Sequence, residues 1–168
     1  QEDVLHHTEL FNADPKLRKT WVAQTGRGDE LGSFDPNNFG DARIELKLKG
    51  RTPDQIKSTN LHELQHQLQH KSGFAQGGMP SDFIDDLSAL KELNAMSFDD
   101  MDSFQKTMFT KLRNKYGGAK EPFEAYRRLV GETEARTVEK RIGLNPAQRK
   151  KKPFFMDFDI PEKDQILR

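Results

Sequence analysis

The chain contains no cysteine among its 168 residues, and this absence excludes several kinds of chemistry. Disulfide bonds, cysteine nucleophiles and thiolate metal sites all require cysteine, so any metal site must be built from histidine and acidic side chains. The absence also favours a reducing compartment, such as the cytoplasm. Because the chain begins at Gln1 and not at methionine, we expect it to be part of a larger polypeptide.

The sequence also has no long apolar run and no net charge. Hydrophobic residues make up 33% of the chain and charged residues 32%, and no run is long enough to span a membrane, so we expect no membrane partner. Lys+Arg and Asp+Glu balance at 27 each, which gives no general attraction to nucleic acid. The basic run 149–152 is typical of a solvated connector, and we do not expect nucleic acid as a partner.

The length predicts one domain over residues 1–168, and the patterning predicts a helix-dominated α+β fold with a small sheet. The clearest strand is 42–48, where apolar and charged residues alternate. A turn leads into a helix over 53–71, whose start carries a Thr-Pro-Asp-Gln capping box and whose end is marked by Gly73. We expect the strand to lie at a sheet edge, because charged residues on its outward face are a common protection of edges.

The other elements carry weaker signals, and residues 1–40 form a weakly placed N-terminal segment. Capping residues, prolines and glycines predict further helices at 15–22, 81–94, 97–116 and 122–142. A short strand is expected near 31–34, a linker at 149–153, and an extended C-terminal tail at 153–168 with a late strand from 154 to 160.

Residues 62–66 read His-Glu-Leu-Gln-His, the H-E-x-x-H pattern of zinc peptidases. On a helix, positions i and i+4 are about 6 Å apart along the axis and about 40° apart around it, so both imidazoles can bind one ion. Glu63 lies about 100° round from His62, where a carboxylate can accept a proton from an activated water and pass it to the leaving amine. The alternative is an amphipathic helix whose histidines are polar surface residues.

A catalytic zinc ion usually has a third protein ligand. His70 is too far, because it lies about 12 Å along the helix axis from His62. Residues 131–136 read Gly-Glu-Thr-Glu-Ala-Arg on the last long predicted helix. We expect Glu132 to be the third ligand, since Ala135 leaves room for close helix packing. Glu134 is the alternative ligand, and both glutamates could also be solvated.

At these residues the chain resembles the gluzincin group of zinc peptidases, in which a later helix supplies a glutamate ligand. Glu132-x-x-Ala135 is similar to the E-x-x-A-D stretch of several members, although Arg136 stands where they often have aspartate. Segments 61–78 and 126–141 more closely resemble metallopeptidase-like domains in the large polyvalent proteins of phages and mobile elements, and the resemblance covers about 42–160. It implies a zincin-like fold, zinc hydrolysis and a virion-associated or cytoplasmic setting, but no particular substrate.

The predicted function is zinc-dependent hydrolysis of peptide bonds in a polypeptide substrate, with Glu63 as the general base. His70, Tyr126 and Arg136 are candidates for contacts to the substrate or transition state, and Tyr116 is a further candidate donor. One alternative is a non-peptidase zinc hydrolase, which a covered strand at 42–48 would favour. The other is a non-catalytic, zinc-stabilised binding module of a larger phage or mobile-element protein, which would not need Glu63.

Overall fold

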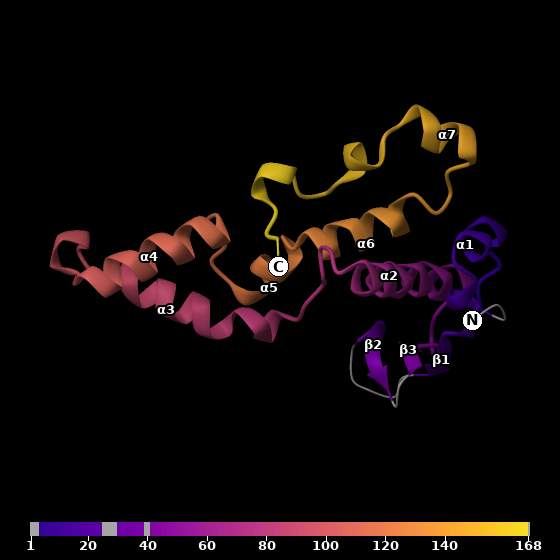
Figure 1. Cartoon of the computed structure of the whole chain (residues 1–168), viewed down its shortest axis with the longest axis horizontal. Helices are drawn as coiled ribbons and strands as arrows, with labels where there is room; N and C mark the ends of the chain where they lie inside the picture. Colours follow the sequence, from indigo (N-terminus) through magenta and orange to yellow (C-terminus); the bar gives the residue numbers. More distant parts are fainter. Residues whose placement is uncertain (1–3, 25–29, 39–40, 168) are drawn as a thin grey trace. The chain divides into compact units, whose positions relative to one another are not determined.

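The computed structural model describes residues 4–24, 30–38 and 41–167. It is helix-dominated, with a three-stranded mixed sheet, as the α+β prediction requires (Figure 1). The chain forms two compact units, which are described separately. The first contains Gln1–Phe74 and Glu134–Phe158, and the second contains Ala75–Thr133 and Asp159–Arg168.

The sheet of the first unit corrects the prediction of an edge strand at 42–48. Its strands are β1 (Trp21–Gln24), β2 (Gly32–Asn38) and β3 (Asp41–Leu46), and their order is β1-β3-β2. β3 therefore lies in the centre, parallel to β1 and antiparallel to β2. Alternation reports which faces of a strand are buried but not which strands flank it, so the sequence could not reveal this order.

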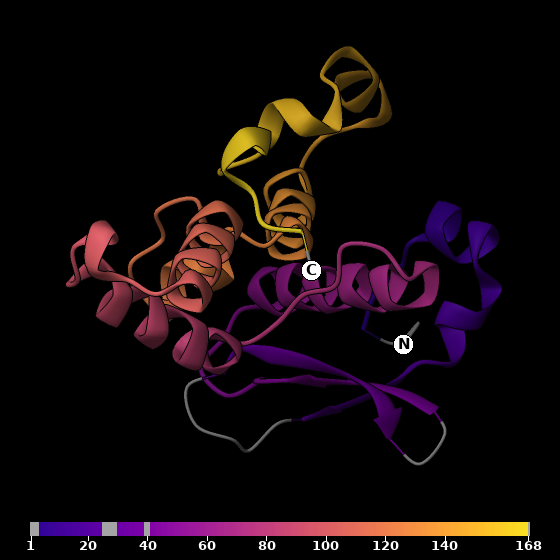
Figure 2. The same cartoon turned by 60° about the vertical axis from the view of Figure 1, so that its left-hand side comes forward.

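Within β3 the alternation predicts burial correctly, but the predicted strand is too long, since β3 ends at Leu46 and Leu48 is 40% exposed. Ile44 and Leu46 are fully buried, while Arg43 and Glu45 point to the other face and form an ion pair with 2.7 Å between their charged atoms. The buried side packs with Leu61 and Leu64 in one core cluster. The helix that carries these leucines, α2 (Pro53–Ser72), lies across one face of the sheet (Figure 2).

The predicted capping signals of α2 are all present. Thr52 Oγ1 accepts a hydrogen bond from the Gln55 backbone N–H, and the Gln55 side chain accepts one from the Thr52 backbone N–H. These two bonds satisfy N–H groups that have no partner within the helix itself. At the other end Gly73 has a φ of 68°, a left-handed conformation that ends the helix and favours glycine.

Two further segments of the first unit differ from the prediction. The expected helix at 15–22 is a 3₁₀ turn, η1 (Pro15–Lys19), after the short α1 (Thr8–Ala13), and Trp21 instead begins β1.

The expected linker at 149–153 is largely helical in α7 (Pro146–Lys151), and the expected late strand at 154–160 contains the 3₁₀ turn η4 (Phe154–Asp157). Asn145 explains α7, because it forms a capping box with Gln148.

The second unit is helical and has its own apolar core. Its elements are η2 (Pro80–Phe83), α3 (Ile84–Asn94), η3 (Phe98–Asp100), α4 (Ser103–Tyr116), α5 (Pro122–Arg127) and η5 (Glu162–Asp164). α3 and α4 lie side by side (Figure 1). The core includes Phe83, Leu87, Leu112 and Leu129. The helix predicted from 97 begins later than expected, because Asp102 and not Ser97 caps it.

The single helix predicted for 122–142 is divided into α5 and α6 (Val130–Lys140). At the break the backbone bonds to a distant segment. The Ile166 N–H donates to Arg128 O at 2.7 Å, and the Val130 N–H donates to Ile166 O at 3.0 Å. Because this partner lies near the end of the chain, the local sequence gave no sign of the interruption.

Candidate metal centre

The two histidines of the H-E-x-x-H motif lie side by side on α2. Their ring centroids are 4.8 Å apart and the ring planes are nearly perpendicular, at 73°. Both residues are half-buried. This arrangement follows from the i, i+4 spacing, which brings two side chains onto one face of a helix.

The proton position on His66 follows from a chain of polar contacts. Gln69 Nε2 donates to Glu134 Oε2 at 2.9 Å, so the carbonyl oxygen of Gln69 faces His66. That oxygen lies 2.9 Å from His66 Nδ1. A carbonyl oxygen only accepts hydrogen bonds, so Nδ1 must carry the proton, and a neutral ring then has its lone pair on Nε2. A lone pair on Nε2 is what a metal ion requires.

His62 also has an oxygen atom beside its Nδ1, in this case from a carboxylate. Its Nδ1 lies 3.5 Å from Oε1 of Glu139, which α6 supplies. A carboxylate beside one ring nitrogen favours a proton at that nitrogen, and metal-binding histidines commonly have such a partner. Helix α6 thus supplies an acid for each histidine. Glu139 lies directly beside His62, and Glu134 acts on His66 through Gln69.

Glu63 lies beside Gly32, the first residue of β2. Its side chain is buried, with 6% exposed. A Cβ atom placed on Gly32 would lie 2.9 Å from Glu63 Oε1 and 2.5 Å from Thr59 Cγ2. Only glycine therefore fits at this point of the strand without displacing its neighbours, and the backbone of β2 closely approaches the carboxylate.

Glu132 is held by the glycine-rich loop that follows α2. It is buried, with 2% exposed, and its Oε1 accepts a hydrogen bond from the Gly78 backbone N–H at 3.3 Å. The preceding residue packs even more closely, since a Cβ on Gly131 would lie 2.1 Å from the carbonyl oxygen of Ala75. The first turn of α6 and the loop at residues 75–78 therefore form one tightly packed substructure.

The other predicted site residues are placed as follows. His70 is exposed, and its ring lies 6.0 Å from that of Phe34 in β2. Tyr126 is half-buried on α5, with its ring 5.8 Å from that of Phe123. Arg136 is half-buried on α6.

Tyr116 does not fit the role of a donor to the substrate. It is a buried residue in the core of the second unit, and its hydroxyl donates to the Asp86 carboxylate. Burial, with a smaller contribution from the carboxylate, raises the pKa of Tyr116. The hydrogen bond from Tyr116, helped by Lys115, lowers the pKa of Asp86. The contact is a structural one within the core.

The donor set of the candidate site suits zinc. Among the described residues, His62 and His66 of the first unit and Glu132 of the second offer the donor atoms that a metal ion requires. Two imidazoles and one carboxylate are a donor set that catalytic zinc sites use. Sequence reasoning did not find Gln69, Glu139, Gly32 or Gly78. Spacing could have pointed to Gln69, which lies one turn after His66, but nothing in the sequence marks the other three.

Comparison with models of protein families, with curated proteins and with solved structures finds no match to this chain. Among the described residues, no helix combines the length and the apolar character needed to cross a membrane.

Proposed function

We propose that the chain is a zinc-dependent hydrolase of peptide bonds, with zinc held by His62, His66 and Glu132. The orientation of the two histidines carries the proposal. Gln69 and Glu139 lie beside the Nδ1 atoms of His66 and His62, and histidines on the surface of an ordinary amphipathic helix have no need of such partners. Partners of this kind are typical of metal ligands, whose Nε2 must keep its lone pair.

The helical period supports Glu132 as the third ligand. Glu132 and Glu139 are seven residues apart on α6, so they lie about 20° apart around its axis and share one flank. Glu139 directs that flank toward His62. Glu134 lies about 140° round from Glu139, and its Oε2 accepts hydrogen bonds from Gln65 and Gln69. Glu134 therefore suits the role of an orienting group, while Glu132 suits that of a ligand.

Zinc bound at these residues would supply Lewis-acid chemistry and lower the pKa of a water molecule toward neutrality. Glu63 would act as the general base, holding a proton on its carboxylate and transferring it to the leaving nitrogen of the peptide. A purely structural zinc site has no use for a buried glutamate between its histidines. The burial of Glu63 thus favours an enzyme over a zinc-stabilised binding module.

The peptide substrate is assigned to β2. β3 is paired on both sides, so it cannot accept a further strand, whereas β2 lies at the end of the strand order and begins at Gly32, beside Glu63. An extended peptide could add to this edge through main-chain hydrogen bonds. The central position of β3 is also the observation that favours a non-peptidase zinc hydrolase, which needs no such platform. The proposal also includes a gluzincin-like fold and an origin of the chain in a larger polyvalent protein of a phage or mobile element.

The proposal is tested by measuring zinc content and hydrolysis on the same preparations. Purified chain should bind one equivalent of zinc by elemental analysis, and His62→Ala or Glu132→Ala should lose it. Glu63→Gln should keep the zinc and lose about 10²–10⁴-fold in turnover, measured by mass spectrometry on a peptide mixture and by colour release from nitrophenyl esters. Glu92→Gln, a change at an exposed glutamate of α3, is the matched control.

The outcomes separate the alternatives. Cleavage of peptides supports the peptidase, and cleavage of esters without peptides supports the non-peptidase hydrolase. Stoichiometric zinc without any turnover would support the binding module. A full equivalent of zinc in His62→Ala would contradict the site itself.

A further inference from the structure

We propose that a second pocket, in the first unit, binds an apolar group that carries a carboxylate. The pocket has a volume of about 310 Å³, at the lower end for ligand sites, which suits a ligand the size of one amino-acid residue. α2 lines it with Lys57 and Leu61, and α6 with Val138. The rest of its lining comes from residues 6–7, near the start of the unit's sequence, and from residues 141–154, near its end. This site is distinct from the proposed zinc ligands, and none of them lines it.

One side of the pocket is apolar. Leu61, Val138, Ile142 and Phe154 contribute to its lining. Leu61 is buried with 8% exposed, and Val138 and Ile142 pack against the same core cluster. These side chains would remove the apolar body of a ligand from water, which favours binding by about 25 cal/mol for each Å² of apolar surface.

The polar part of the lining consists of hydrogen-bond donors and contains no acidic side chain. It comprises His6, His7, Lys57, Arg141 and Arg149. The imidazole Nδ1 of His7 accepts a hydrogen bond from the Leu10 backbone N–H, so the proton of a neutral ring is on Nε2, where it can be donated. Lys57 is exposed and makes no hydrogen bond or ion pair within the described residues.

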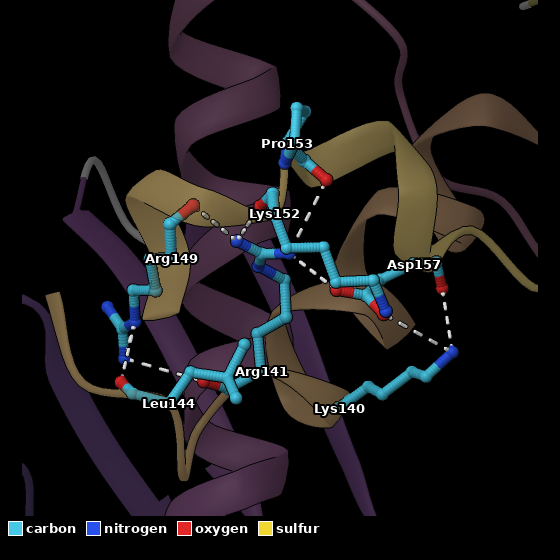
Figure 3. A network of polar contacts seen from close by, with 7 residues as sticks. All are labelled: Lys140, Arg141, Leu144, Arg149, Lys152, Pro153 and Asp157. Atoms are coloured by element: carbon cyan, nitrogen blue, oxygen red, sulfur yellow. Dashed lines mark hydrogen bonds and ion pairs between the residues drawn. The ribbon is translucent and has the colours of Figure 1, made fainter. Parts of the chain in front are cut away.

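The neighbouring arginines are fixed by contacts that leave a surplus of positive charge. Figure 3 shows the Arg141 guanidinium donating to Asp157 and to the carbonyl oxygens of Arg149, Lys152 and Pro153. Asp157 also pairs with Lys140 and Lys152, so this carboxylate faces three cations. Arg149 donates to the carbonyl oxygens of Leu144 and Arg141, and these neutral groups do not cancel its charge.

An anion with an apolar body satisfies both features of the pocket. A carboxylate accepts charge-assisted hydrogen bonds from the ammonium group of Lys57 and from imidazole and guanidinium N–H groups. An uncharged ligand would leave the surplus charge without a counterpart, and a bare inorganic anion would leave the apolar wall exposed to water. The carboxylate could belong to a small organic acid or to the C-terminal residue of a peptide, and the chemistry recognised is the same.

The test is titration calorimetry on the full chain in the presence of EDTA, which prevents carboxylates from binding to zinc. The probes are N-acetyl-phenylalanine, its uncharged amide, a tetrapeptide ending in phenylalanine, and inorganic phosphate. We expect one or both free carboxylates to bind in preference to the amide and to phosphate. Tighter binding of the tetrapeptide would identify a peptide C-terminus, and tighter binding of the acetylated amino acid would identify a small acid.

Two variants and one control locate the binding. Lys57→Gln should weaken binding about tenfold, because it removes a charged donor. Val138→Phe fills the pocket and should abolish binding, with circular dichroism confirming that the chain is folded. Lys91→Gln, at an exposed lysine of α3, should change nothing. Equal binding of acid and amide, equal binding of phosphate, an unaffected Lys57→Gln, or no binding at all would each overturn the proposal.

Discussion

At the scale of single residues, the candidate site depends on side chains that orient other side chains. Gln69 is buried, with 3% exposed, and it links His66 to Glu134. The acid donates nothing, so it determines which end of the amide faces the histidine, and the amide in turn determines the proton position on the ring. The sequence favours Glu132 over Glu134 as the expected ligand, and the hydrogen bond from Gln69 supports an orienting role for Glu134.

The first prediction is that Gln69→Leu weakens zinc binding by about 10–100-fold, the usual effect of losing the partner of a metal-binding histidine. The variant removes the carbonyl oxygen of Gln69, which favours the proton at Nδ1 of His66. Gln65→Leu is the matched control, because Gln65 also donates to Glu134 but has no contact with His66 among the described contacts. Competition with a chromophoric chelator measures the affinity. Equal loss in both variants would show that the contact with His66 has no special role.

The second prediction is that Gly32→Ala lowers turnover while zinc stays bound. The new methyl group would lie 2.9 Å from Glu63 Oε1 and 2.5 Å from Thr59 Cγ2, so the carboxylate or the strand must move. Overpacking of this kind also costs about 1–3 kcal/mol of the free energy of unfolding.

A double variant separates the two effects of this methyl group. Adding Thr59→Ser to Gly32→Ala removes the Cγ2 contact and should restore much of the stability but not the turnover. Urea unfolding and peptide cleavage are measured on both variants. Full turnover in Gly32→Ala would show that the position of Glu63 is not critical.

At the scale of elements, the packing of helix α6 determines where its glutamates lie. Its first turn begins where the Val130 N–H donates to Ile166 O, and Gly131 lies directly against the loop at residues 75–77. Ala75 in that loop has a φ of 53°, a left-handed conformation that is rare for residues other than glycine. The loop, the helix start and Glu132 therefore form one closely packed structure.

The third prediction follows from this packing. Gly131→Ala should lower the free energy of unfolding by about 1–3 kcal/mol, because its Cβ meets the carbonyl oxygen of Ala75 at 2.1 Å and backbone atoms cannot easily move away. It should also weaken zinc binding through the displacement of Glu132. Gly143→Ala is the control, since nothing lies within 4 Å of its added Cβ. Equal stability of the two variants in urea would contradict the packing argument.

The fourth prediction concerns α7 and the turn after it. Hydrogen bonds from Lys152 and then Arg141 lower the pKa of Asp157 below its ordinary value. A lowered pKa in the folded state means that the ionised form stabilises the fold. This stabilisation is complete above the ordinary pKa of about 3.9 and is lost as the pH falls through the lower value of the folded state.

Asp157→Asn should therefore reduce the unfolding midpoint at pH 7, and the difference from the unchanged chain should shrink below about pH 4. Asp85→Asn, at an exposed aspartate of α3, provides the control. Thermal unfolding between pH 3 and pH 7 measures both. A difference that grew on acidification would show that Asp157 is not held in its ionised form.

At the scale of the whole molecule, the formal net charge is zero and the pI is about 7.2, so no long-range field favours a particular polyanion or polycation. Charge is nevertheless unevenly distributed, because Lys140, Arg141 and Lys152 gather around one carboxylate. Within the described residues each unit has its own core, one between the sheet and α2 and the other among α3, α4 and α5. The sequence shows neither the division into two units nor the clustering of charge, since both arise from segments far apart along the chain.

The sequence by itself determined the features that depend on neighbouring residues. The capping box at Thr52, the left-handed end at Gly73, the burial pattern of Ile44 and Leu46, and the proximity of His62 to His66 all follow from contacts within one or two helical turns or one strand. Tertiary structure decided the order of the strands, the break between α5 and α6, and the orientation of the histidines. Those depend on partners such as Glu134, which lies 65 residues from Gln69 in the chain, and local preferences carry no information about a partner so distant.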